Sequence, residues 1–258
     1  LPPNERVQGR AIDGTFYLDG KIDLKRPFPY HILIKMQDAR LEKFAAEYMA
    51  GQRNLRGIMN GWLELWGDSS APQSPSGRSN TTAMKGNGEL HIMPAALYEL
   101  PALMQIFRLI QFVPADNPAF AEAHMMFDIA KNQINFRQIT LLGDAINLYG
   151  LGFVNFDGRL GMEFRYRVPQ TGGPLPFVKG LVGLVANDGW GISLTGTTTE
   201  PVAVLRALPK LDPRLNELFR TIEFDRKTNI PGSPGTTRRQ SSNDPPRVNQ
   251  LPEETSPQ

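Results

Sequence analysis

The chain has 258 residues, which is enough for one large all-β domain or two ordinary domains with a buried core. Its 28 Lys and Arg residues nearly balance 26 Asp and Glu residues, giving a net charge of +2, and no basic run exceeds two residues. This composition disfavours a nucleic-acid-binding surface. Cysteine is absent, which excludes disulfides, thiol nucleophiles and thiolate metal sites.

Strand patterns dominate the first part of the chain. Glycines between short apolar runs over residues 7–24 are typical of the turns of a β-meander. Alternation at 32–37 predicts another strand, and an apolar stripe over 41–49 predicts a short amphipathic helix. The clearest alternation in the chain runs from Leu55 to Trp66. The polar Ser/Pro/Gly segment that follows, 67–80, predicts a mobile loop longer than compact folds usually need.

A helical pattern follows a further strand at 84–92. Apolar residues recur every three or four positions from Pro94 to Phe112, which predicts the one substantial helical segment within residues 1–200. Pro94 suits a helix start, and Pro101 is expected to kink or restart the helix. We expect this helix to pack over the concave side of the sheet as a groove cap. Its apolar stripe consists of Leu97, Leu100, Met104, Phe107 and Ile110.

Strand patterns resume in the second half of the chain, each with one apolar face and one mixed or polar face. They occupy residues 120–129, 146–156, 160–168 and 190–197. Such strands are typical of a curved antiparallel sheet, so the fold expected is mainly β, a curved sheet forming a trough with a few short helices. Gly57, Gly61, Gly150 and Gly152 either let this sheet bend or mark turns and bulges, and both interpretations stay open.

The end of the chain has a different composition. A short amphipathic helix is expected at 213–222. Beyond Asn229 the residues are mostly Pro, Ser, Gly, Asn and Thr, which predicts a disordered tail. We therefore predict a β-rich domain over residues 1–225 and a disordered tail over 226–258.

The order of these elements is more informative than any one of them. The strand "LRGIMNGWLELWG", a loop and "GNGELHIMPAALYELPALMQIFRLI" are followed by "AFAEAHMMFDIAKNQINFRQITLLGDAINLYGLGFVNFDGRLGMEFRYRV" and "GISLTGTTTEPVAVL". This succession resembles the C-terminal region of AsmA-family proteins, in which a Gly-rich strand, a short helix, a Leu-Pro pair and an apolar helix precede a long β-meander. The resemblance covers about residues 28–209, and the 67–80 loop looks like an insertion in it.

The resemblance implies a membrane-tethered envelope protein of diderm bacteria with most of its mass in the periplasm. The family is similar to groove-forming lipid-transfer proteins, so the expected partners are phospholipid or another lipid, the membrane through a part absent from this chain, and envelope proteins. It implies a role in lipid transport and outer-membrane biogenesis, with no cofactor and no catalytic residues, and the histidine spacing described below indicates no metal site. Leu1 indicates a fragment or a processed form of a longer protein.

The apolar strand faces supply the candidate lipid-contacting residues. A curved sheet with an apolar concave face offers a dry trough, and each CH₂ group of an acyl chain buried there contributes about 0.8 kcal/mol. Methionine suits adaptable binding surfaces, although ordinary core filling accounts for most methionines. The candidates are Met59, Leu63, Leu65, Met125, Phe127, Leu148, Val154 and Met162.

Two rival functions compete with a lipid trough. One is a structural or regulatory envelope-assembly factor that binds protein partners and whose trough is a closed core. The other is a small-ligand-binding or hydrolytic barrel, for which the signals are weak. His31, His91 and His124 all lie in strand patterns without helical metal-ligand spacing, so satisfied or solvent-facing histidines are expected. The strand carboxylates are expected on the wet face, and we predict that the chain is not an enzyme.

Overall fold

The computed structural model describes residues 7–25, 27–49, 54–68, 84–110, 120–144, 146–167, 190–207 and 210–228. The chain divides into one compact unit, Leu1–Thr221, and a second unit, Ile222–Gln258. The predicted disordered tail beyond Asn229 and most of the predicted loop at 67–80 lie outside the described residues.

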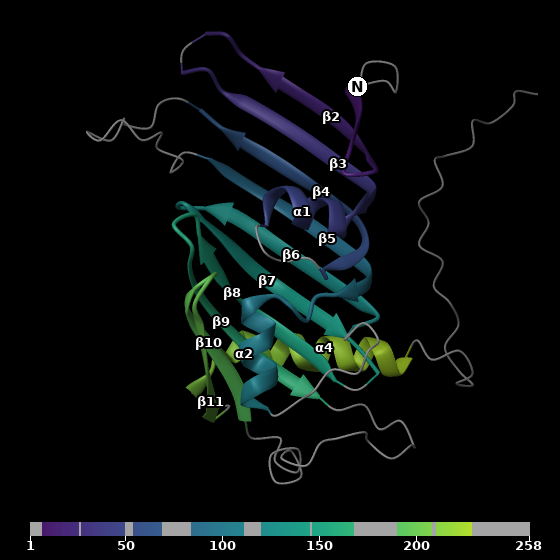
Figure 1. Ribbon diagram of the computed structural model, residues 1–258. Coiled ribbons are helices and arrows are strands. Elements are labelled where there is room, and N and C mark those ends of the chain that lie inside the picture. Colours follow the sequence, from purple (N-terminus) through teal and green to yellow (C-terminus); the bar gives the residue numbers. More distant parts are fainter. Residues whose placement is uncertain are drawn as a thin grey trace, which may run out of the picture. The chain divides into compact units, whose positions relative to one another are not determined.

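The first unit is built on one antiparallel sheet of eleven strands, in which each strand pairs with the next along the chain (Figure 1). The sheet is open, with β1 and β11 as its edges, and it confirms the predicted curved antiparallel fold. The strands are β1 (Val7–Ala11), β2 (Gly14–Ile22), β3 (Tyr30–Arg40), β4 (Arg56–Gly67), β5 (Lys85–Ala96), β6 (Glu122–Ala130), β7 (Gln133–Leu142), β8 (Asn147–Asn155), β9 (Arg159–Arg167), β10 (Trp190–Thr197) and β11 (Pro201–Ala207).

Tight turns hold this meander in register. Ile12 and Asp13 between β1 and β2 have φ of 47° and 61°, and Lys131 and Asn132 between β6 and β7 have φ of 53° and 66°. Two successive residues with positive φ are the signature of a type I′ turn, whose twist matches that of the strands it joins. Each turn therefore sets the pairing of a whole hairpin.

Three helices accompany the sheet. They are α1 (Leu41–Tyr48), α2 (Pro101–Leu109) and α4 (Pro213–Thr228). In Figure 1, α1 and α2 lie on one face of the sheet, α1 against β4 and α2 against β10 and β11. The first turns of α4 lie on the opposite face, where Leu211 and Leu215 pack against Leu151 of β8.

The helices partly correct the sequence-based predictions. The helix predicted at 41–49 is confirmed as α1. The helix predicted from Pro94 to Phe112 begins only at Pro101, because residues up to Ala96 continue β5 and the backbone N–H of Ala95 donates to the Phe120 carbonyl at 3.0 Å. With nine residues α2 is hardly longer than α1, which has eight. The helix expected at 213–222 is confirmed as α4 and extends further, to Thr228.

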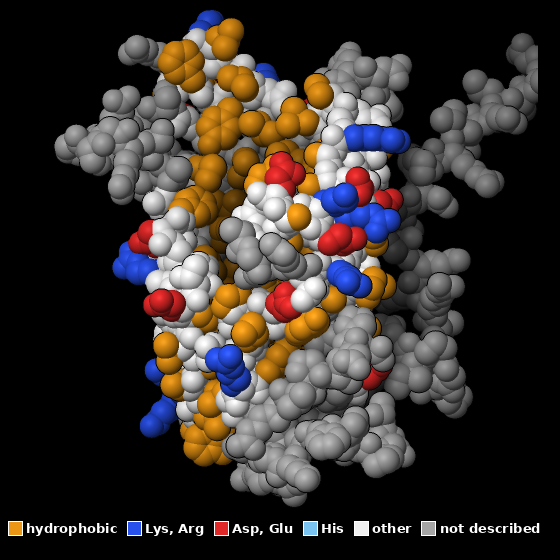
Figure 2. Space-filling view, in the orientation of Figure 1, with side chains coloured by type: hydrophobic (Ala, Val, Ile, Leu, Met, Phe, Trp, Pro, Cys, Tyr) orange, Lys and Arg blue, Asp and Glu red, His pale blue; other side chains and the backbone are white. Residues whose placement is uncertain are grey.

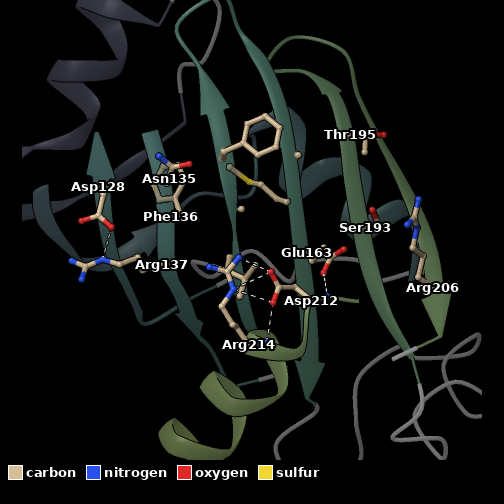
Figure 3. A pocket seen from close by; sticks show the side chains of 15 residues that line it. Asp128, Asn135, Phe136, Arg137, Glu163, Ser193, Thr195, Arg206, Asp212 and Arg214 are labelled. Atoms are coloured by element: carbon tan, nitrogen blue, oxygen red, sulfur yellow. Dashed lines mark hydrogen bonds and ion pairs between the residues drawn. The ribbon is translucent and has the colours of Figure 1, made fainter. Parts of the chain in front are cut away.

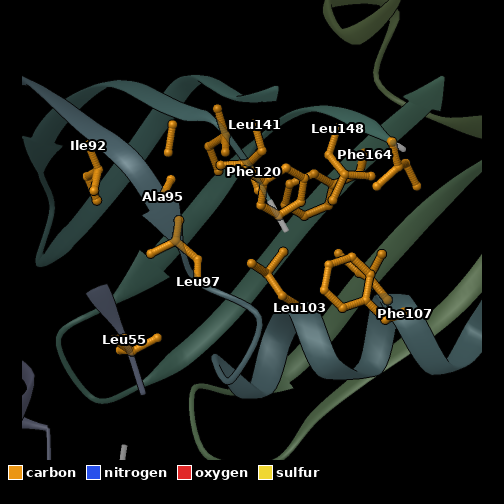
Figure 4. Packing of buried hydrophobic residues seen from close by; sticks show 14 of the residues in the cluster. Leu55, Ile92, Ala95, Leu97, Leu103, Phe107, Phe120, Leu141, Leu148 and Phe164 are labelled. Atoms are coloured by element: carbon orange, nitrogen blue, oxygen red, sulfur yellow. The ribbon is translucent and has the colours of Figure 1, made fainter. Parts of the chain in front are cut away.

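The strand registers align the apolar positions in rows that cross the sheet. We call the face that carries these rows the inner face and the opposite one the outer face. One row, here called the covered row, joins β4 to β8. It consists of Met59, Ile92, Ala123, Leu141 and Leu148, each at most 4% exposed. These side chains pack with Leu55, Leu97 and the buried side of α2 into the main hydrophobic core (Figure 4).

Candidate binding surface on the inner face of the sheet

All eight predicted lipid-contacting residues lie on the inner face, but in two environments. Met59 and Leu148 belong to the covered row and are 4% and 0% exposed. The other six are half-buried. They are Leu63, Leu65, Met125, Phe127, Val154 and Met162.

The half-buried residues belong mainly to two further rows, which we call the open rows. The first consists of Leu63, Gly88, Phe127, Phe136, Gly152 and Met162. The second consists of Leu65, Gly86, Ile129, Ile134 and Val154. No position of the open rows carries a charged or hydrogen-bonding side chain.

Apolar side chains therefore remain partly accessible where the helices do not cover the sheet. In Figure 2, hydrophobic side chains gather in a band on this face and extend into a hollow beside α1. The rings of Phe127 and Phe136 lie 6.0 Å apart within the first open row. Contiguous apolar surface of this kind usually marks a site of interaction with protein, ligand or membrane.

Two glycines on the inner face leave room for aromatic rings from the neighbouring strands. A Cβ atom at Gly88 would lie 2.6 Å from Cζ of Phe127, and one at Gly150 would lie 2.3 Å from the Phe164 ring. Each ring therefore lies over the glycine of the neighbouring strand and occupies the space of its missing side chain. The predicted role of Gly150 is thus refined, because its lack of a side chain gives room to Phe164.

The predicted capping helix buries a different set of residues in the core than its sequence pattern suggested. Leu97, Phe107 and Ile110 are buried and Leu100 is half-buried, but Met104 is 38% exposed. Leu103 and Ile106, which were not predicted, complete the buried stripe. Residues 97 and 100 precede the helix and therefore do not define its buried face. Within the helix that begins at Pro101, the buried positions are 103, 106, 107 and 110, and the sequence pattern did not show where the helix begins.

The outer face is polar and holds a cluster that was not predicted. Glu89 and His91 lie two residues apart on β5, and His124 on β6 is paired directly with His91. The two imidazole rings stack with their centroids 3.9 Å apart. Sequence spacing gives no signal for this cluster, because only the register of β5 and β6 brings the two histidines together.

A surface pocket of about 810 Å³ also opens on the outer face, beside the start of α4 (Figure 3). Its carboxylates are engaged by neighbours. Asp128 lies 3.0 Å from Nε of Arg137, Asp212 lies 2.6 Å from Nη2 of Arg214, and Glu163 accepts the backbone N–H of Asp212 at 2.5 Å. Each of these three carboxylates therefore has an ion-pair or hydrogen-bond partner within the fold.

Comparisons with known proteins give no relative from which a function could be transferred: no family model, curated protein or solved structure matches the chain. Among the residues that the structure describes, no helix has the length and apolar character required to cross a bilayer.

Proposed function

We propose that the chain is a non-catalytic domain of an AsmA-like envelope protein in the periplasm, and that it holds or conducts lipid along the open rows. The observation that supports this proposal is the pair of uncharged rows, in which Leu63, Leu65, Phe127, Val154 and Met162 are half-buried on the same face as the fully covered core row. The sheet is open, so an acyl chain could reach these rows from solvent without unfolding the core.

The chemistry of the open rows favours an acyl chain as the bound group. An acyl chain needs apolar contact without hydrogen bonds, and the open rows offer Leu, Ile, Val, Met and Phe side chains and glycine backbone. Each CH₂ group transferred from water onto such a surface contributes at most about 0.8 kcal/mol.

A second candidate function is that of an envelope-assembly factor that binds protein partners without transporting lipid. Its support comes from the edge of the sheet, because β1 is an edge strand and all five of its residues are exposed. An exposed edge strand can pair with an extended segment of another protein. This function requires no accessible trough.

Uptake of a fluorescent phospholipid by matched variants tests the proposal. Leu63→Gln places a polar group in an open row, and Leu33→Gln makes the same change at a half-buried residue on the outer face of β3. Lipid binding should fall in Leu63→Gln and persist in Leu33→Gln, while both variants keep the parent's circular dichroism spectrum. Equal binding by both variants, or none by the parent, would favour the assembly factor.

A further inference from the structure

The two stacked histidines on the outer face share one carboxylate. Nε2 of His91 lies 3.0 Å and Nε2 of His124 lies 2.8 Å from the same atom, Oε1 of Glu89. The three candidate ligand atoms all lie within 4.8 Å of one another. Two imidazole nitrogens and one carboxylate oxygen are a ligand set that divalent transition metals prefer.

Neighbouring side chains hold these groups in an orientation suited to a metal. The indole N–H of Trp62 donates to Oε2 of Glu89 at 3.1 Å, which leaves Oε1 directed at the histidines. Nδ1 of His91 lies 3.8 Å from Oε1 of Glu122, and a carboxylate on this side of the ring is a usual neighbour of a metal-bound histidine. The amide nitrogen of Gln138 lies 3.3 Å from Nδ1 of His124, so this amide must turn to present its oxygen for Nδ1 to carry the proton and leave Nε2 as the ligand.

Charge and access also suit a cation. The carboxylate of Glu89 lies at the centre of the cluster, with its Oε1 atom 3.0 Å from Nε2 of His91 and 2.8 Å from Nε2 of His124. Glu122 places a second carboxylate at the rim. The side chains of His91 and Glu89 are 39% and 29% exposed, which leaves an open side where water can complete the coordination.

We propose that Glu89, His91 and His124 form a binding site for a divalent transition metal, with Zn²⁺ as the expected ion. Tetrahedral ligands at zinc distances are about 3.3 Å apart, so each nitrogen must move away from Oε1 by a few tenths of an ångström. The two rings must also turn about Cβ–Cγ to converge on one ion, and this torsion has a broad energy minimum in histidine. The bound ion would join β5 to β6 on the face opposite the open rows, so this site is independent of lipid binding.

Zinc titration of the full chain tests the site, with the third histidine as a matched control. His31 lies on the same outer face, with Nε2 2.6 Å from Oε1 of Glu64, but it has no second histidine beside it. The protein should carry no histidine tag and be treated with a chelator first. Isothermal titration calorimetry then measures affinity and stoichiometry, and NMR of the ring nitrogens distinguishes the three histidines.

We expect one Zn²⁺ per chain, with the ring signals of His91 and His124 shifted and those of His31 unchanged. Glu89→Gln and His124→Gln should each weaken zinc binding about tenfold or more, while His31→Gln should match the parent. If the circular dichroism spectrum of Glu89→Gln or His124→Gln differs from that of the parent, His91→Asn, which alters the more exposed ring, takes the place of that variant. No zinc binding by the parent, or equal loss in His31→Gln, would overturn the proposal.

Discussion

Met59 and Leu65 lie six residues apart on the same face of β4, yet their surroundings differ. Met59 is 4% exposed and belongs to the main hydrophobic core, whereas Leu65 is half-buried in an open row. A methionine in a closed core and a leucine on an accessible surface should respond differently to the same truncation.

Alanine substitution at these two positions measures that difference. Met59→Ala should lower the free energy of unfolding by about 2–5 kcal/mol, because it leaves a cavity that the surrounding strands cannot fill. Leu65→Ala should cost about 1 kcal/mol, since part of its side chain is already accessible to solvent. Urea denaturation followed by circular dichroism gives both values. Equal costs would mean that the open rows belong to the closed core.

A second residue-scale prediction concerns the glycine beneath Phe164. Gly150→Ala places a Cβ atom 2.3 Å from that buried ring and should destabilise the fold by about 1–3 kcal/mol through overpacking. Gly9→Ala is the matched control in edge strand β1, because no atom lies within 4 Å of its added Cβ. The control should stay within about 0.5 kcal/mol of the parent. Similar melting temperatures for both variants would contradict the packing of Phe164 over Gly150.

At the scale of elements, the start of α4 depends on Asp212. Its carboxylate accepts the backbone N–H of Arg214 at 2.9 Å and pairs with the guanidinium of the same residue. The helix then continues to Phe219, whose ring lies 3.8 Å beneath the guanidinium of Arg165 on β9. Asp212 therefore acts as the N-terminal cap of the helix on the outer face.

Removal of this cap should loosen the first turn of α4. Asp212→Ala is expected to cost about 0.5–2 kcal/mol in the free energy of unfolding, whereas Glu217→Ala, at an exposed position of the same helix, should cost little. Hydrogen exchange of the α4 amides should increase in Asp212→Ala only. An equal effect of the two substitutions would show that the carboxylate does not cap the helix.

The same carboxylate predicts a dependence of stability on pH. The hydrogen bond and ion pair with Arg214 lower the pKa of Asp212 below its usual value. The stabilisation is therefore complete above the ordinary aspartate pKa of about 4 and is lost as the pH falls through the lower, folded-state value. Melting temperatures recorded over this acidic range should fall less steeply for Asp212→Asn than for the parent. Identical slopes would show that protonation of Asp212 does not cause this loss of stability.

Strand periodicity predicted most of the sheet, and it failed where tertiary pairing decides the structure. The alternation of β4 correctly placed Met59, Leu63 and Leu65 on one face. β7 and β11 were not assigned as separate strands, and β5 was ended too early because the pattern after Pro94 also fits a helix. The pairing of Ala95 with Phe120 keeps that segment in the sheet, and no local pattern contains this information.

The candidate sites also depend on tertiary structure that local sequence patterns do not contain. Alternation identified the lipid-contacting residues as a set on one face, but it could not separate the buried Met59 and Leu148 from the accessible Leu63 and Leu65. That distinction depends on which parts of the sheet the helices and connecting segments cover. The cluster of Glu89, His91 and His124 depends on the β5–β6 register in the same way.

At the scale of the compact unit, the inner face of the sheet has two environments. The covered row joins the sheet to the main core, while the open rows carry apolar side chains that are half-buried. In the proposed function, stability depends on the covered row and lipid binding on the open rows. The proposed lipid function depends on this separation.

Native mass spectrometry of the full chain after incubation with phospholipid vesicles tests the central claim most directly. We predict a folded protein that carries phospholipid, with much lower occupancy in Leu63→Gln and parental occupancy in Leu33→Gln. A parent chain that stays folded and carries no lipid at any vesicle concentration would contradict the account.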